Sequence, residues 1–329
     1  YELHKDNDMT NFANGRTTVL AGHGFAESGP YLLINDVEQG EQHRFPVLGK
    51  TFSLRRLPTR RCVGRFDLAS YTKEVCPLNV ELLPDAKDTM CPACQEATGF
   101  NPSFYYALTV SPQQRAYNEQ PHYTYLAYFA PGFVKAGISS EGRGVRRLLD
   151  QGARAARVVG RFKNVYAARE LEAALCMQEG ICETMRLSKK ADLLANARFD
   201  FGEACRALDE AAASVDVAGC FGTASDAPTE LDAAMERLGR GEGKAYFDFT
   251  SAYFGDEAVP TCDEMQLADA SADVCAGRCV GMVGSILVLE QQGMHFLAPL
   301  KDWESHVVEL HEGEVLHEYA VAPVQMSLL

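Results

Sequence analysis

The most strongly patterned stretch of the 329-residue chain reads His122-Tyr-Thr-Tyr-Leu-Ala-Tyr-Phe-Ala-Pro-Gly-Phe-Val-Lys-Ala-Gly-Ile138. Aromatic and β-branched residues favour strands, and the Pro-Gly pair at 131–132 favours a turn. The stretch therefore predicts a β-hairpin with strands over residues 122–129 and 133–138.

Three further elements follow this hairpin in the sequence. Residues 145–152 predict a helix that ends at a glycine, and residues 156–160 predict a third strand. Residues 166–177 predict a second helix, because Leu171 and Leu175 fall on one helical face. Together these elements predict an α/β unit.

Four of the eleven cysteines follow the spacing Cys62-x13-Cys76-x14-Cys91-x2-Cys94. A tetrahedral zinc ion takes two thiolates from one turn and two from elsewhere, and Cys91-Pro-Ala-Cys94 is such a turn. We expect these four residues to bind a structural Zn²⁺. The alternatives are a redox-active Cys-x-x-Cys motif and unligated core cysteines.

The segments on either side of the α/β unit predict strands and helices. Short strands are expected from residue 17 to 52, amphipathic helices over 199–214 and 229–238, and an antiparallel meander after 246. The expected fold class is α+β. The expected units are 1–120 (N-terminal β and zinc-binding module, stapled by zinc), 121–198 (α/β core), 199–245 (helical connector) and 246–329 (C-terminal antiparallel β module).

Charge is distributed unevenly along the chain. The formal net charge is −14, which argues against a protein coated in nucleic acid. Residues 200–329 hold six basic and 24 acidic side chains, whereas residues 135–169 hold nine basic and two acidic ones. A nucleic acid or an anionic small molecule is the expected partner of the 135–169 face, and a merely solvated surface is the alternative.

Several protein classes are excluded by what the sequence lacks. No run of about 18 apolar residues is present, so we expect no membrane span. The polar N-terminal residues lack the pattern of a secretory signal, and we expect a cytoplasmic protein. Phosphate-binding loops, dinucleotide fingerprints, serine-hydrolase elbows and zinc-protease motifs are also missing.

The order hairpin, helix, strand, helix resembles the GIY-YIG nuclease-like superfamily. Its members carry a Tyr on the first strand, a Tyr or Lys on the second, an Arg opening the next helix and a Glu on the following helix. Tyr125, Lys135, Arg147 and Glu172 stand at these positions, with Glu170 as the near alternative to Glu172. The resemblance implies a GIY-YIG-like core for the α/β unit.

A second resemblance covers most of the chain. The zinc cysteines are followed by Tyr-Leu-Ala-Tyr, Val-Lys-Ala-Gly-Ile-Ser and Asp150-Gln-Gly-Ala153, an order similar to that of the DUF2797 family. The glycine-rich segment Gly281-Met-Val-Gly-Ser-Ile-Leu-Val-Leu289 also fits this family. The family is uncharacterised, so this resemblance implies no activity.

The residue types at the GIY-YIG positions suit phosphodiester cleavage. Arg147 can bind the charge that develops on phosphorus, and Glu172 can hold Mg²⁺ or Mn²⁺. Tyr125 has a reference pKa of about 10 and needs nearby positive charge, which Lys135 can supply, to act as a base. Each residue also has a structural interpretation, as a strand aromatic, a surface cation or a solvated carboxylate.

Three neighbours of these four residues are candidates for substrate binding. His122 opens the first strand, and Arg146 adjoins Arg147. Gln151 stands at helical spacing after Arg147, where a histidine is expected from the superfamily pattern.

The sequence predicts a metal-dependent GIY-YIG-like enzyme that acts on a phosphodiester or another anionic substrate. Two alternatives are open. One is a non-catalytic, zinc-containing nucleic-acid-binding or adaptor protein with Arg55, Arg56, Arg60 and Arg61 on its contact face. The other is an enzyme that keeps the fold but acts on a small molecule.

Overall fold

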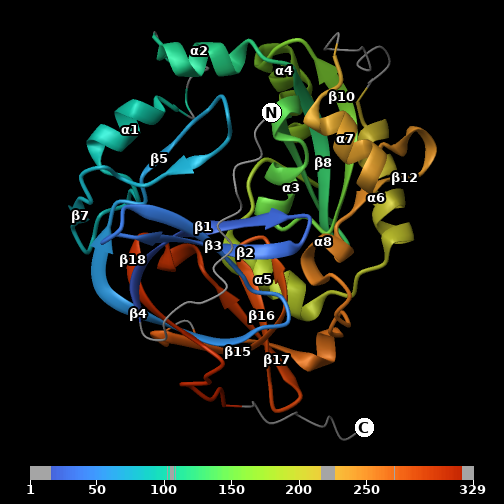
Figure 1. Ribbon diagram of the computed structural model, residues 1–329. Helices are drawn as coiled ribbons and strands as arrows, with labels where there is room; N and C mark the ends of the chain where they lie inside the picture. Colours follow the sequence, from blue (N-terminus) through green and yellow to red (C-terminus); the bar gives the residue numbers. More distant parts are fainter. Residues whose placement is uncertain are drawn as a thin grey trace, which may run out of the picture.

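The computed structural model describes residues 16–101, 103, 107, 109–215, 227–269 and 271–320. The blue and red strands from the two ends of the chain form one β layer, and the green and yellow elements form an α/β layer beside it (Figure 1). This mixture of sheets and helices confirms the α+β class. Among the described residues, no helix is long and apolar enough to cross a bilayer.

The larger sheet joins strands from both ends of the chain, in the order β14-β17-β16-β15-β4-β18-β1-β2-β3, with β7 paired to β4. Its strands are β1 (Arg16–Ala26), β2 (Gly29–Asp36), β3 (Glu41–Pro46), β4 (Thr51–Arg61), β7 (Glu81–Leu82), β14 (Met265–Leu267), β15 (Val274–Val283), β16 (Ile286–Gln291), β17 (Met294–Pro299) and β18 (His306–Glu312). Because β4 lies between β15 and β18, the expected first and last units share one sheet. The boundaries near residues 120, 198 and 245 stay a prediction.

The smaller sheet has the order β11-β9-β8-β10-β13-β12. Its strands are β8 (His122–Ala130), β9 (Phe133–Ser140), β10 (Ala155–Phe162), β11 (Ile181–Cys182), β12 (Gly239–Arg240) and β13 (Tyr246–Asp248). Strands β8 and β9 pair antiparallel, which confirms the predicted hairpin. Every residue of β8 is buried, because both its edges are paired and both its faces are covered.

The helices confirm the expected α/β order around this sheet. They are α1 (Pro92–Thr98), α2 (Pro112–Asn118), α3 (Arg146–Gln151), α4 (Val165–Cys176), α5 (Leu187–Asn196), α6 (Phe201–Ala213), α7 (Glu230–Leu238) and α8 (Thr250–Phe254). Thr229 starts α7 through a reciprocal capping box with Asp232. The sequence analysis did not predict α5.

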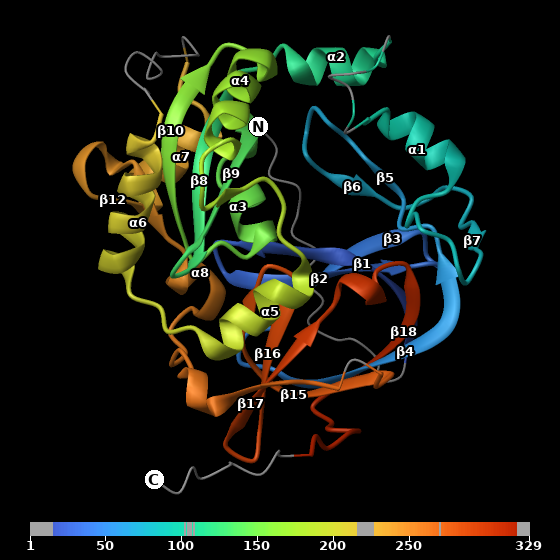
Figure 2. The same ribbon diagram turned by 180° about the vertical axis from the view of Figure 1, so that it is seen from behind.

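The two faces of the smaller sheet have different neighbours. On one face, Leu126 and Tyr128 of β8 pack with apolar residues of α4 and α6. On the other face, Tyr125 and Phe129 share a core with α3, α5 and strands of the larger sheet. Figure 2 shows α5 beside strand β16. The Tyr125 face therefore lies between the two sheets.

Candidate functional site

Four cysteine side chains converge beside the larger sheet. Cys62 follows β4, and Cys76 follows β6 (Lys73–Glu74), which pairs with β5 (Arg65–Phe66). Cys91 directly precedes α1, and Cys94 lies in the first turn of that helix. All four are buried and in no disulfide, and their sulfur atoms lie within 4.8 Å of one another.

This arrangement fits a tetrahedral metal ion such as zinc. With Zn–S bonds of about 2.3 Å, tetrahedral sulfur atoms lie about 3.8 Å apart, and the sulfurs of Cys76 and Cys91 are separated by 4.0 Å. The backbone amides of Cys91 and Gly64 donate to the sulfur of Cys62 at 3.1 and 3.4 Å, an arrangement that stabilises a metal-bound thiolate. Burial of all four thiols argues against a redox role, which needs an accessible thiolate.

Tyr125 lies in the middle of β8, and its side chain is 1% exposed. Its partner across the hairpin is Gly137, where a Cβ would lie 2.5 Å from Cζ of the tyrosine, so the ring crosses directly over the glycine. The side-chain amide of Gln151 donates to the Tyr125 hydroxyl at 2.6 Å. Because the hydroxyl accepts this bond, its own proton is available to a second group.

Arg147 and Gln151 lie on the same side of α3, because they are four residues apart. Gln151 is buried and Arg147 is exposed. The guanidinium of Arg147 lies close enough to the Tyr125 hydroxyl to oppose the rise of its pKa. Among the described residues, Arg147 has no carboxylate partner within ion-pair distance.

Two lysines lie beside this group. Lys135 of β9 donates to the carbonyl of Ala136 at 3.0 Å. Lys190 of α5 donates to the backbone carbonyl of Gln151 at 2.7 Å. Neither lysine pairs with a carboxylate in the part of the chain that the structure describes. We call Tyr125, Lys135, Arg147, Gln151 and Lys190 the cationic cluster.

Members of the cluster contribute to the pKa shifts of their neighbours. Burial, opposed by Arg147 and Gln151, raises the pKa of Tyr125, so its hydroxyl is protonated at neutral pH. Burial and then the charge of Arg147 lower the pKa of Lys135. Burial, followed by Lys135 and Arg147, lowers the pKa of Lys190 to about 8. The cluster therefore has a positive field that favours an anion.

One carboxylate, Glu172 of α4, acts on this cluster through its charge. It raises the pKa values of Tyr125 and Lys135. Glu172 is buried and forms an ion pair with Arg169, which also pairs with Glu183 at 2.9 Å. No hydrogen bond joins Glu172 to the cationic cluster among the described residues.

His122 and Arg146 have other surroundings. The Nδ1 atom of His122 lies 2.7 Å from the carbonyl of Gln120, and its ring meets Tyr117 edge to face at 5.0 Å. Burial lowers the pKa of His122 to about 4, so its ring is neutral at pH 7. Arg146 is exposed at the start of α3. Both stay predictions as substrate-binding residues.

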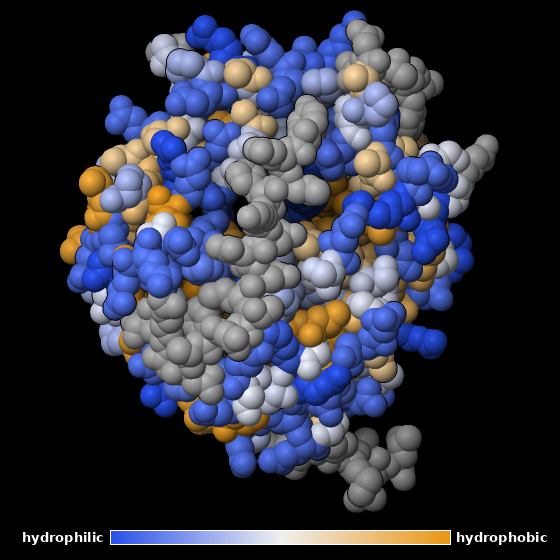
Figure 3. All heavy atoms as spheres, viewed as in Figure 1, coloured by the Kyte–Doolittle hydropathy of each residue, from blue (hydrophilic) through white to orange (hydrophobic). Residues whose placement is uncertain are grey.

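The basic residues of the 135–169 stretch fall into two groups. One group forms ion pairs with carboxylates: Arg143, Arg157, Arg161 and Arg169. The other has no such pair within the described ranges: Lys135, Arg146, Arg147, Arg154 and Lys163. Two of the second group, Lys135 and Arg147, belong to the cationic cluster, and an anionic partner for this stretch stays a prediction. On the molecular face drawn in Figure 3, most of the coloured atoms belong to hydrophilic residues.

The four arginines between residues 55 and 61 have partners within the chain. Arg55 and Arg56 pair with Glu309 and Asp273 at 3.4 and 2.8 Å. Arg60 is buried and donates to Ser305 and to the carbonyls of Pro84 and Ala86. Arg61 donates to the carbonyl of Asn79 and lies 3.7 Å from Glu81. These side chains support the larger sheet and its loops.

The sequence analysis missed Lys190 as a residue of the cluster. Lys190 lies on α5, which follows α3 and α4 in the chain. The GIY-YIG resemblance assigned site residues only to α3 and α4 among the helices. A signal was present, because Leu187, Ala191 and Leu194 have helical spacing and place Lys190 beside a buried face.

The comparisons with known proteins bear on the family. The model of DUF2797, described as a protein of unknown function, matches residues 49–308. No curated protein and no solved structure is significantly similar to the chain. The matched region includes the four cysteines, the cationic cluster and the glycine-rich segment that begins at Gly281. Because this model covers more than half of its length, the chain belongs to the DUF2797 family.

Proposed function

We propose that the protein is a GIY-YIG-like enzyme that acts on a phosphodiester or another anionic substrate at the cationic cluster. One observation carries the proposal. Lys135, Arg147 and Lys190 come from three different elements and have no carboxylate partner among the described residues, and the charges of Arg147 and Lys135 contribute to the lowered pKa of Lys190. Such a concentration of positive charge is costly without an anion beside it.

The side chains suit the cleavage of a phosphoester bond. Arg147 is exposed and offers a planar group of donors to the phosphoryl oxygens. Lys135 adds positive charge where negative charge develops in the transition state. The Tyr125 hydroxyl is held by Gln151 and keeps its proton, so we assign it a hydrogen bond to substrate or water rather than the role of a base.

A small anionic substrate is favoured over a long polyanion. The arginines from 55 to 61 are engaged within the chain, and the net charge of −14 repels an extended nucleic acid. The non-catalytic nucleic-acid-binding hypothesis is therefore the weaker alternative, and the small-molecule enzyme is the stronger one.

Hydrolysis assays test the proposal with bis(p-nitrophenyl) phosphate, DNA and RNA as substrates, in Mg²⁺ and in Mn²⁺. We expect Arg147→Gln to lower kcat/KM by about 10²–10³-fold, as the loss of a donor to a developing oxyanion does. The control is Lys163→Gln, because Lys163 belongs to the same basic stretch but is exposed outside the cluster. If the wild type leaves every substrate intact, the proposal is wrong; if the two variants lose activity equally, the site is misassigned.

The catalytic Mg²⁺ or Mn²⁺ suggested by the sequence fits this arrangement poorly. Glu172 is its expected ligand, but that carboxylate is buried against Arg169 and faces a positive field. A divalent cation would have to displace Arg169 toward Glu183, so we assign no catalytic step to a metal. The four cysteines remain the better metal site.

Replacing Arg169 by glutamine should therefore strengthen Mn²⁺ binding by about tenfold or more, because the Glu172 carboxylate loses its competing cation. Electron paramagnetic resonance of free Mn²⁺ measures this affinity. Lys189→Gln removes a surface ion pair with Asp192 and should leave it unchanged. Equal Mn²⁺ affinity in the wild type and Arg169→Gln would contradict the claim that Arg169 is what keeps a metal from Glu172.

A further inference from the structure

Two sequence motifs that contain glycine meet next to the cationic cluster. Asp150-Gln-Gly-Ala153 ends α3, and Gly281-Met-Val-Gly-Ser285 leads through the turn from β15 to β16. Gly152 and Gly284 both have positive φ, and a Cβ on Gly284 would lie 2.9 Å from the nitrogen of Gly152. Two glycines are therefore needed for the larger sheet to touch the end of α3.

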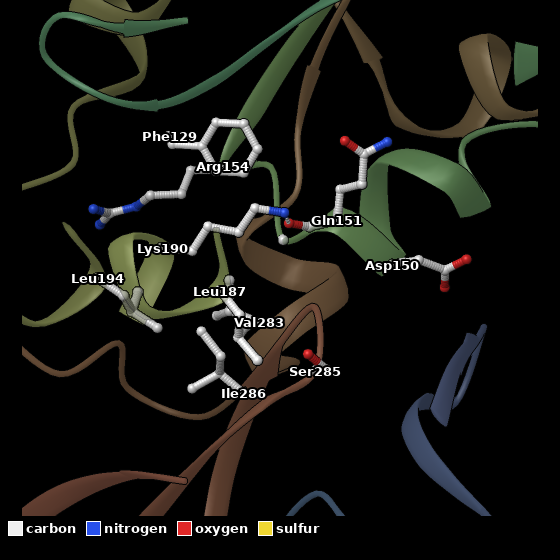
Figure 4. A pocket seen from close by; sticks show the side chains of 11 residues that line it. Phe129, Asp150, Gln151, Arg154, Leu187, Lys190, Leu194, Val283, Ser285 and Ile286 are labelled. Carbon is white, nitrogen blue, oxygen red and sulfur yellow. Dashed lines mark hydrogen bonds between the residues drawn. The ribbon is translucent and has the colours of Figure 1, made fainter. Parts of the chain in front are cut away.

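A small cavity lies at this junction (Figure 4). Its lining includes Lys190, Gln151, Phe129, Val283, Ser285 and Ile286. The cavity volume is about 30 Å³, whereas about 10–15 Å³ is enough for one water molecule. The cavity therefore has room for about two or three water molecules, whose place the oxygens of an anionic group can take.

Lys190 brings positive charge to this cavity. Its ammonium lies 2.7 Å from the carbonyl of Gln151 and 5.1 Å from the centre of the Phe129 ring. In Figure 4, Lys190 extends from α5 toward the end of α3, while the carboxylate of Asp150 turns away. Asp150 pairs instead with Arg143 at 2.7 Å. Asp150 and Arg154 also line the cavity, but no described carboxylate forms an ion pair with Lys190.

Gln151 connects this cavity to the cationic cluster. Its backbone carbonyl accepts from Lys190, and its side-chain nitrogen donates to Tyr125. The Oε1 atom of Gln151 is buried and has no hydrogen-bond partner among the described residues, but as an acceptor it offers no bond to a deprotonated phosphate. The group that favours an anion at this junction is therefore the Lys190 ammonium, and Gln151 ties it to Tyr125.

We propose that this cavity is a second anion subsite, in which Lys190 binds one phosphate of a substrate whose neighbouring phosphate lies at Arg147 and Lys135. This inference rests on the proposed function, because it assumes that the cluster binds an anion. It narrows the substrate class to compounds with two linked phosphate groups. The Lys190 ammonium and the cavity bind one phosphate group, and Arg147 and Lys135 bind the phosphate group that reacts.

Calorimetric titration of the full chain with inorganic phosphate and inorganic pyrophosphate tests the subsite. We expect the wild type to bind pyrophosphate about tenfold or more tightly than phosphate. Lys190→Gln should abolish this preference, whereas Lys190→Arg should keep part of it. Lys189→Gln is the matched control, because Lys189 is the neighbouring residue on α5 and pairs with Asp192 at the surface. A nucleoside diphosphate that binds more tightly than pyrophosphate would assign the two phosphates to a nucleotide.

The outcomes separate this inference from the proposed function. If Arg147→Gln weakens both ligands while Lys190→Gln keeps the preference for pyrophosphate, the cluster binds anions but the subsite is wrong. If Arg147→Gln binds both ligands like the wild type, the proposed function is wrong as well. Should Lys190→Gln fail to fold, Ser285→Val narrows the cavity without a change in charge and should also abolish the preference.

Discussion

Cys94→Ser is expected to lose the zinc ion and to unfold the segment between β4 and α2. In small zinc-binding domains, structural zinc supplies about 10–16 kcal/mol of apparent binding free energy that is coupled to folding. The segment has few other sources of stability, because its local sheet consists of two-residue strands, β5 and β6. Elemental analysis should find one zinc per wild-type chain and much less in the variant.

The loss of zinc should also perturb the cationic cluster, because the zinc-binding segment contacts the end of β9. Tyr71, in the zinc-binding segment, donates to Gln120 and accepts from Ser140 at the end of β9, both at 2.7 Å. Strand β9 carries Lys135 and Gly137, so we expect Cys94→Ser to reduce activity and to lower the melting temperature. Cys262→Ser is the control, because Cys262 lies outside the four-cysteine group. Wild-type zinc content and stability in Cys94→Ser would contradict the assignment.

Gly137→Ala is expected to remove most of the activity by displacing Tyr125. The new Cβ would lie 2.5 Å from Cζ of the tyrosine, so the ring must move and its hydrogen bond with Gln151 must break. Overpacking of this kind costs about 1–3 kcal/mol of stability. We expect kcat/KM to fall by about 10²-fold, because the hydroxyl would leave the reacting groups.

A matched control exists in the larger sheet. A Cβ on Gly24 would lie 2.5 Å from Cζ of Tyr31, the same geometry at a tyrosine that is not part of the cationic cluster. Gly24→Ala should therefore cost similar stability, measured by urea unfolding, but keep activity in the folded protein. Equal activities for the two variants would mean that Tyr125 has only a packing role.

Local patterns in the sequence predicted the elements of the α/β unit well. The hairpin, α3 and α4 were found from strand composition, a terminal glycine and the spacing of Leu171 and Leu175. The four cysteines were found from spacing alone, because two thiolates from one turn are a strong constraint. The GIY-YIG-like assignment and the roles of the site residues stay predictions.

Contacts between distant segments could not be predicted in the same way. Strand β4 pairs with β15 and β18, more than 200 residues away, and periodicity within a strand does not name its partner. The contact of Lys190 with the Gln151 carbonyl depends on how α5 packs. The Arg169–Glu172 pair is local and was missed, although a spacing of three residues on a helix favours an ion pair.

The central claim is that Lys135, Arg147 and Lys190 form one anion-binding site. Sulfate tests it directly, because its charge is constant between about pH 6 and pH 10 and only the protein titrates. Since burial and the neighbouring cations lower the pKa of Lys190 to about 8, bound sulfate should raise this pKa. Sulfate affinity should then be highest below pH 8 and fall as the pH rises through 8.

The decisive measurement is an NMR titration of the lysine side-chain signals against pH, with and without sulfate. We predict that sulfate raises the pKa of Lys190 by about one unit, or about 1.4 kcal/mol, and leaves Lys189 unaffected. The same shift should vanish in Arg147→Gln. A Lys190 pKa that is the same with and without saturating sulfate would contradict the account.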